Sequence, residues 1–278
     1  MDPITEPLIV IKPYQEWVFT ATLVIFAAAM LWESFAPRRS LSEGVIWRWS
    51  NNFSLGLLTW YVTLVVNSWL SLAVAATSKE HGLGLLANWE TSVAVDLILL
   101  LLATQFISYW VHRAFHHFEW LWPIHAVHHT DTDVDVSTSY RHHPLEPIAS
   151  LFATAPVILL LGPSIEAVFY YRLFAVGANV FSHSNIAIPV ALDKQLRKVI
   201  LTPDYHRIHH CSDSHYTNSN YGSLAPWFDY LFGTAKSRPV DEQTDMELGL
   251  EYFREREDSR LDQQLLQPLK LWSGRKEA

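Results

Sequence analysis

Long uncharged runs constrain the fold of this chain more than any other feature of its sequence. Sixteen uncharged residues separate Glu16 from Glu33, and thirty separate Arg48 from Lys79. A membrane-spanning helix needs about 20 predominantly apolar residues, so the first run is short for one span and the second is long. A soluble chain of 278 residues has too little remaining polar sequence to cover several such helices, so a membrane protein is favoured over a large soluble core.

Three further runs follow the same pattern. Residues 91–111 carry a single charge, Asp96, and nineteen uncharged residues separate Glu146 from Glu166. The last run is residues 173–192, which contain no charged side chain and one histidine. Together the five runs predict an all-α, polytopic membrane protein with four to five transmembrane helices and a helical cap that carries the histidine clusters.

Basic residues indicate the orientation of the chain. They gather in the segments that follow the first run and flank the later ones: Arg38, Arg39, Arg48, Arg113, Arg141, Lys194, Arg197, Lys198 and Arg207. Cytoplasmic loops are enriched in lysine and arginine, so these segments are expected in the cytoplasm and the acidic amino terminus outside. The turn at Gly162 and Pro163 could instead belong to a re-entrant hairpin, which would lower the number of spans and leave the sidedness unchanged.

Three short histidine clusters lie just outside the uncharged runs, on the side expected to be cytoplasmic. The first is His112 and His116, at the end of the third run. The other two share the spacing H-x-x-H-H and contain His125, His128, His129, His206, His209 and His210. On a helix, positions i, i+3 and i+4 lie on one face, so each cluster can direct two or three imidazoles to one point. Eight imidazoles exceed the roughly four to six ligands of one metal ion and predict a dinuclear site.

The remaining histidines differ in their surroundings. His183 lies within the last apolar run, where an unpaired ionisable group is costly, and is predicted to be a further ligand. His142 and His143 precede a proline and are expected in a turn, from which one of them could add a ligand. The other three are interpreted as structural or solvated: His81, His117 and His215.

Ligand type alone does not identify the metal, because imidazole suits zinc, iron, copper and nickel. A structural zinc site would normally use cysteine, and the one cysteine, Cys211, is interpreted as a packed residue. Hydrolytic two-metal sites usually include a carboxylate, whereas Asp131, Asp133 and Asp135 lie in a polar stretch that is expected to be exposed. A multi-histidine pair at a membrane surface therefore favours iron and dioxygen acting on a lipid C–H bond.

The same residues resemble a known family, the fatty acid hydroxylase and sterol desaturase superfamily. The segments that match its pattern, in order, are His112–His116, Leu121–Asp131, Arg141–Glu146, Phe181–Asn185, Thr202–His210, Asn220–Gly222 and Phe228–Thr234. The resemblance covers residues 95 to 235 approximately. It implies an integral membrane enzyme that uses two iron ions and dioxygen to hydroxylate or desaturate a lipid of sterol, fatty acyl or alkylglycerol type.

The resemblance also implies a set of metal ligands. These are His112, His116, His125, His128, His129, His206, His209 and His210, with His183 in addition and His143 preferred to His142. Asn179, one helical turn before His183, could orient an imidazole, hold a metal-bound water or pack helices. Asp229 is expected either to orient a ligand imidazole or to cap a helix. Asn220 and Tyr221 match the family pattern without a role that the sequence reveals.

Three regions are expected along the chain. Residues 1–90 would form amino-terminal transmembrane helices, residues 91–235 the catalytic domain, and residues 236–278 a charged cytoplasmic tail. The mixed charges of the tail predict a solvated helical or partly disordered end.

Charge and motif content constrain the partners. The formal charge of -8 argues against nucleic acid. The sequence contains no haem-binding donor domain and no dinucleotide fingerprint, so a separate electron-donor protein is expected alongside the lipid substrate and the bilayer. A membrane metal-binding or transport protein is the alternative, although its ligands should be scattered along a span as a pathway.

Overall fold

The structure, a computed structural model, describes residues 5–41, 44–63, 66, 69–86 and 88–275. Its helices are α1 (Thr5–Phe35), α2 (Val45–Val62), α3 (Trp69–Glu80), α4 (Val93–His117), α5 (Trp122–His129), α6 (Leu145–Leu161), α7 (Ile165–His183), α8 (Val190–Leu196), α9 (Pro203–His209), α10 (Ser214–Thr217), α11 (Trp227–Phe232), α12 (Val240–Thr244) and α13 (Leu261–Trp272). The described residues also form two 3-10 helices, η2 (Val136–Tyr140) and η3 (Arg256–Ser259). The predicted all-α class is confirmed.

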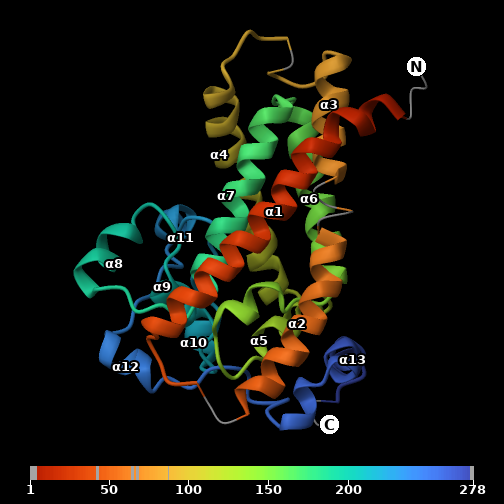
Figure 1. The fold of residues 1–278 in the computed structure, drawn as a ribbon. Helices are drawn as coiled ribbons and strands as arrows, with labels where there is room; N and C mark the ends of the chain where they lie inside the picture. The colour runs from red at the N-terminus through yellow and green to blue at the C-terminus, as the bar shows by residue number, and fades with distance from the viewer. Residues whose placement is uncertain (1–4, 42–43, 64–65, 67–68, 87, 276–278) are drawn as a thin grey trace.

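The helices separate into a bundle and a cap. In Figure 1 the apolar helices α3, α4, α6 and α7 run upright, α1 crosses them obliquely, and α5 and α8 to α13 gather around the lower end of the bundle. Helix α1 begins at the upper end, whereas the carboxyl-terminal helix α13 lies at the lower end, beside α5. The first and last parts of the chain therefore lie at opposite ends of the molecule.

Two helices are long and apolar enough to cross a membrane, Ile11–Phe35 within α1 and Val93–His117, which is α4. Less than a third of the residues in the apolar stretch of each helix are buried, unlike the central helix of a soluble core. Large apolar side chains are also exposed on the other helices of the bundle, including Leu57, Phe152, Leu160, Tyr170 and Phe174. An exposed apolar surface of this kind suits a bilayer, whereas the count of four to five spans stays a prediction.

The uncharged runs differ in how they fold. The second run contains α2, which ends at Val62, and α3, which begins at Trp69. The last run is interrupted after His183, because Ser184 adopts an extended conformation with ψ of 152°. His183 therefore lies at the end of a helix rather than deep inside a span.

The aspartates that follow α5 are buried, so the expectation of an exposed polar stretch is wrong. Arg48 of α2 reaches this stretch and pairs with Asp131 at 3.0 Å, with Asp133 at 3.9 Å and, more closely, with Asp135. Burial raises the pKa of Asp131, but the guanidiniums of Arg48 and Arg141 outweigh this effect and lower it. Buried carboxylates are tolerated because they are paired, and a pairing partner more than eighty residues away along the chain is not visible in local sequence.

Several basic residues that indicated the orientation are also buried. Arg48, Arg141 and Arg207 are buried, and Arg207 pairs with Asp204 at 2.7 Å. Their positions follow from internal pairing, so they say little about which side of a membrane they face. The orientation of the chain stays a prediction that rests on the remaining basic residues.

The carboxyl-terminal region packs against the cap instead of forming a solvated end. Met246 and Leu248 are buried in one apolar cluster with Val134 and Cys211, which confirms Cys211 as a packed residue. In α13, the Gln267 side chain accepts a hydrogen bond from the Thr130 hydroxyl at 3.2 Å. Charged residues dominate the composition of this region, so its buried face is not apparent from the sequence. The predicted domain boundaries stay predictions.

Candidate metal centre

Nine histidines come together in two groups where the cap meets the bundle. The five-histidine group consists of His112, His116, His125, His129 and His209, and the four-histidine group consists of His128, His183, His206 and His210. Within each group, the nitrogen atoms that could bind a metal lie within 4.8 Å of one another. Two nitrogens bound to one ion at about 2.1 Å each are at most about 4.2 Å apart, so each group is close to the size that one ion requires.

Each H-x-x-H-H motif contributes to both groups. In α5, His125 and His129 belong to the five-histidine group and His128 to the four-histidine group. At α9 the assignment is reversed: His206 and His210 belong to the four-histidine group and His209 to the five-histidine group. The reason is helical geometry, because neighbouring residues are about 100° apart around the axis while positions i and i+4 nearly overlap. The two groups are adjacent, since the rings of His129 and His210 stack with centroids 4.6 Å apart.

Oxygen acceptors hold the Nδ1 atoms of five of these imidazoles. The pairs are His112 with Tyr221 O (2.9 Å), His125 with Glu146 Oε1 (2.9 Å), His128 with Arg141 O (3.3 Å), His183 with Asn179 O (2.8 Å) and His209 with Ser219 O (2.6 Å). A backbone carbonyl or a carboxylate can only accept, so the hydrogen of each ring lies on Nδ1. The Nε2 atom of each ring is thereby left with a free lone pair.

These lone pairs face one another. His112 Nε2 lies 3.0 Å from His125 Nε2, and His128 Nε2 lies 3.1 Å from His183 Nε2. Neither nitrogen of either pair carries a hydrogen, so the contacts are not hydrogen bonds, and His209 Nε2 is buried without any partner among the described residues. Converging lone pairs repel unless a cation lies between them, so the donor set fits metal ions.

Burial favours the neutral form of five of the clustered imidazoles. Desolvation and, after it, the neighbouring histidines lower the pKa well below its ordinary value at His128, His129, His206, His209 and His210. The neutral form is the one that binds a metal, so no proton has to be displaced from these rings near pH 7.

Glu146 is a functional candidate that the sequence analysis did not single out. It lies in the first turn of α6 and accepts a hydrogen bond from His125 Nδ1, on the side of the ring opposite to Nε2. The carboxylate therefore orients a candidate ligand, and its spacing of four residues from His142 was the available signal.

The structure does not bring His143 into either group, although the sequence analysis preferred it to His142. The ring of His142 stacks on His128 with centroids 3.9 Å apart, and its Nδ1 lies 3.0 Å from Glu146. His143 points elsewhere and accepts a hydrogen bond from the Leu145 backbone N–H at 3.3 Å. Consecutive residues at a turn face different directions, which a match to a motif does not resolve. The isolated histidines are all exposed: His81, His117 and His215.

Asp229 acts on the site through a loop. It accepts the backbone N–H groups of Tyr221 at 2.7 Å and Gly222 at 2.8 Å, and the Tyr221 carbonyl in turn accepts from His112. A Cβ at Gly222 would lie 2.5 Å from Ala225 O, so the loop requires glycine there. Asp229 is therefore a positioning residue one step removed from an imidazole.

Asn220 and Asn179 hold backbone rather than metal-bound groups. Asn220 adopts a left-handed conformation with φ of 55°, and its side-chain amide donates to Tyr205 O at 3.0 Å. The Asn179 side chain donates to Ser139 O at 2.8 Å, so of the three roles considered for it the structure supports helix packing. Its backbone carbonyl is the group that accepts from His183.

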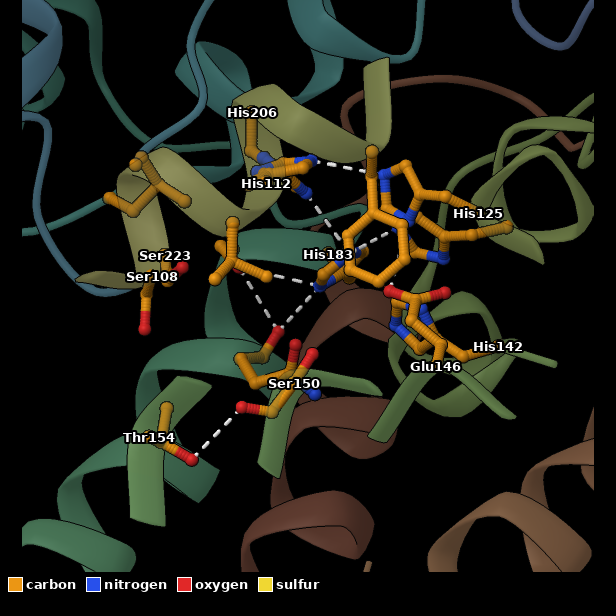
Figure 2. Close-up of a pocket in the computed structure, with 17 residues that line it drawn as sticks. Ser108, His112, His125, His142, Glu146, Ser150, Thr154, His183, His206 and Ser223 are labelled. Carbon is orange, nitrogen blue, oxygen red and sulfur yellow. Dashed lines mark hydrogen bonds and ion pairs between the residues drawn. The ribbon is translucent and has the colours of Figure 1, made fainter. Parts of the chain in front are cut away.

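A cavity of about 160 Å³ touches both histidine groups. Figure 2 shows His112, His125, His183 and His206 on one side of it, and Ser108, Ser150, Thr154 and Ser223 around the remainder. A separate hollow of about 480 Å³ is lined by His116 and Trp122 together with carboxyl-terminal residues such as Glu251 and Tyr252. The five-histidine group thus borders both cavities, and the four-histidine group borders the cavity of about 160 Å³.

Comparison with known proteins places the site in a family context. The sequence model described as fatty acid hydroxylase matches residues 97–234. Alkylglycerol monooxygenase of Homo sapiens is 29% identical over 133 residues, which are 48% of this chain and 29% of that protein. A very-long-chain aldehyde decarbonylase of Oryza sativa subsp. indica is 34% identical and a methylsterol monooxygenase of Arabidopsis thaliana 31% identical, each over 153 residues, 54% of this chain and 56% of the relative. The chain therefore spans less than two thirds of each relative, and no solved structure matches it.

Proposed function

The chain belongs to the fatty acid hydroxylase family, and from this premise we propose that it is an integral membrane, di-iron, oxygen-dependent enzyme that hydroxylates or desaturates a C–H bond of a lipid. The observation that carries the proposal is the pair of adjacent histidine groups whose Nε2 lone pairs converge. Imidazoles whose Nε2 lone pairs face one another at about 3 Å are not held together by hydrogen bonds, so their arrangement points to bound cations.

Each histidine group would hold one ion. The proposed ligands are His112, His116, His125, His129 and His209 for one ion, and His128, His183, His206 and His210 for the other. His143 lies in neither group and is not among the proposed ligands. A nitrogen-rich set without thiolate suits iron, and two bound irons would supply the activation of dioxygen and the removal of hydrogen from an unactivated carbon.

The residues of this chain position the substrate for that chemistry. The cavity of about 160 Å³ is lined by His112 and His125 of one group and by His128, His183 and His206 of the other, so a carbon held there lies beside both. Glu146 and the backbone carbonyls keep the rings oriented toward it. Hydroxylation and desaturation begin with the same hydrogen removal, and the position of the bound chain decides between them.

The lipid would reach the cavity from the bilayer. Helices α4, α6 and α7 line it and also expose apolar side chains on the outside of the bundle. We place these helices among four to five spans, with the cap and the histidine groups on the cytoplasmic side.

A separate electron-donor protein would approach the other cavity. The ring of Trp122 lies 5.0 Å from that of His116 and 5.6 Å from that of His129, between the five-histidine group and the hollow of about 480 Å³. Its Nε1–H donates to the Tyr252 hydroxyl at 2.9 Å, so an aromatic pair connects the group to the hollow. This face is the proposed docking side for the donor.

Metal transport is less well supported by the same geometry. A transport pathway places ligands at several depths along a span. Here nine of the described histidines converge at one end of the bundle, and the candidate nearest a span interior, His183, ends its helix.

The test is the metal content of detergent-purified protein, expressed with iron and freed of any chelating tag. We expect about two irons per chain, an unchanged content in the exposed control His81→Ala, and an oxygen-dependent product from a lipid screen. Less than about half an ion of any metal per chain would remove the basis of the proposal.

A further inference from the structure

Helices α8 and α11 form a platform, residues 190–200 and 227–232, at the side of the molecule. In Figure 1, α8 projects outward where the bundle meets the cap. The Tyr230 hydroxyl donates a hydrogen bond to the Arg197 carbonyl at 3.0 Å, which ties α11 to the end of α8. The two short helices therefore form one unit.

The platform continues the apolar surface of a membrane-spanning candidate. The rings of Phe232 and Trp110 lie 5.1 Å apart and join α11 to α4, which is long and apolar enough to cross a membrane. Large apolar side chains are also exposed on the platform itself, at Leu192, Val199 and Leu231. Exposed apolar groups beside basic ones are typical of a segment that lies in the interface of a bilayer, so we expect the platform at that level.

A basic hollow of about 710 Å³ borders the platform. Four basic residues line it: Lys194, Arg197, Lys236 and Arg238. Val190 lies one turn before Lys194 on the same face of α8 and also lines the hollow, so apolar and basic side chains share its wall. The volume is in the range of about 300 to 1,000 Å³ that small-molecule sites occupy.

Two of the four cations are paired within the protein. Arg197 pairs closely with the buried carboxylate of Asp193, four residues before it. Arg238 lies 3.5 Å from the carboxylate of Glu242. These two pairs leave little net charge for a ligand.

The two lysines have no carboxylate partner. In the part of the chain that the structure describes, the Lys194 ammonium forms no ion pair or hydrogen bond, and the Lys236 ammonium donates to the backbone carbonyl of His215. The lining contains one carboxylate, Asp241. Two lysines against one aspartate leave about one positive charge, which matches the single negative charge of a phosphodiester.

We propose that the basic hollow binds the phosphate of an anionic phospholipid from the adjoining bilayer, with the acyl chains of the lipid against the exposed apolar side chains of the platform. The inference goes beyond the proposed function, because it concerns the membrane surface and not the reaction. Basic residues near a bilayer surface attract anionic lipids, and here they line a hollow large enough for a head group. The apolar surface beside it distinguishes a phospholipid from a soluble phosphate.

The test is the choice of neighbouring lipid by the full chain in phosphatidylcholine nanodiscs. A fluorescent label is attached at Leu231→Cys, which is 69% exposed and does not line the hollow, whereas Cys211 is buried. A small fraction of the lipid carries a nitroxide quencher at one acyl position, on either phosphatidylglycerol or phosphatidylcholine. The quenching by the two lipids is compared as a ratio.

The variants remove two positive charges each. Lys194→Gln with Lys236→Gln removes the two unpaired lysines of the hollow. The matched control is Lys198→Gln with Lys270→Gln, because Lys198 lies on the platform without lining the hollow and Lys270 lies on α13. The thermal unfolding midpoint of each variant shows whether it folds as the unmodified chain does.

We expect phosphatidylglycerol to quench about fivefold more than phosphatidylcholine in the labelled chain and in the control, and less than about twofold more in the variant of the hollow. Inorganic phosphate should lower the ratio no more than chloride at the same ionic strength, because it lacks acyl chains. Absence of quenching, equal quenching by both lipids, the same loss in the control, or displacement by inorganic phosphate would overturn the proposal. The metal content of the same preparation tests the proposed function separately.

Discussion

The two histidine groups use the same motif and differ in how their imidazoles are held. All four rings of the four-histidine group are buried, at 4% exposure or less, and two have Nδ1 held by backbone carbonyls. The five-histidine group has one more ring and a carboxylate behind His125, but His112 and His116 are only partly buried. The four-histidine group therefore has a minimal set of donors and borders the cavity of about 160 Å³, whereas the five-histidine group has a spare donor and also borders the hollow of about 480 Å³.

Because the neighbouring residues His209 and His210 belong to different groups, substitutions at these two positions should have different effects. A group with four donors should lose its ion when any donor is removed, whereas a group with five donors retains four. The five-histidine group should exchange its ion more readily, because it borders the cavity of about 160 Å³ and His116 also lines the hollow of about 480 Å³.

Removal of both ions has the largest expected effect. When the free ion concentration is 100 to 1,000 times the dissociation constant, a bound ion adds about 3 to 4 kcal/mol to the free energy of unfolding. A chelator removes this contribution at each group. We expect ions to leave in two phases, the five-histidine group first, with a fall in the thermal unfolding midpoint at each phase. Metal content and unfolding followed together during chelation measure this, and loss in a single phase would contradict the contrast in access.

Adjacent substitutions come next. His210→Ala should lower the metal content from about two ions per chain to about one, because the four-histidine group is left with three donors. His209→Ala leaves four donors in its group and should retain more than one ion. Elemental mass spectrometry of both variants, with His81→Ala as the control, makes the comparison. Identical losses in the two variants would show that the groups do not act separately.

Glu146→Gln should weaken one group alone. The carboxylate accepts from His125 Nδ1, and loss of such a partner typically costs about 10- to 100-fold in metal affinity. Competition with a chelator of known affinity measures the loss, which is expected at the five-histidine group while the four-histidine group is unchanged. An equal loss at both groups would mean that Glu146 acts on the cap as a whole.

Asp229→Asn should have the smallest effect. Asp229 reaches His112 through the Tyr221 backbone, so its loss is expected to weaken binding at the five-histidine group less than about tenfold. The matched control is Asp213→Asn, because Asp213 also accepts a backbone N–H, from His215 at 2.9 Å, in an exposed position. A similar loss in both variants would remove the positioning role of Asp229.

The sequence was sufficient for the parts of this protein that depend on local pattern. Helical periodicity and apolar runs predicted the all-α class, and the family match confirms the resemblance that the histidine motifs carried. The eight clustered histidines and His183 all lie in the two groups. These features could be predicted because residue type and spacing along one helix determine which side chains share a face.

Only the tertiary structure decided what depends on contacts between distant segments. It divided each H-x-x-H-H motif between two groups, placed Glu146 rather than His143 beside an imidazole, and buried Asp131 against Arg48. It also packed the charged carboxyl-terminal region onto α5. Each outcome depends on a partner that arrives from another element, and the free energy of burying a charge or an imidazole depends on that partner rather than on the residue's neighbours in sequence.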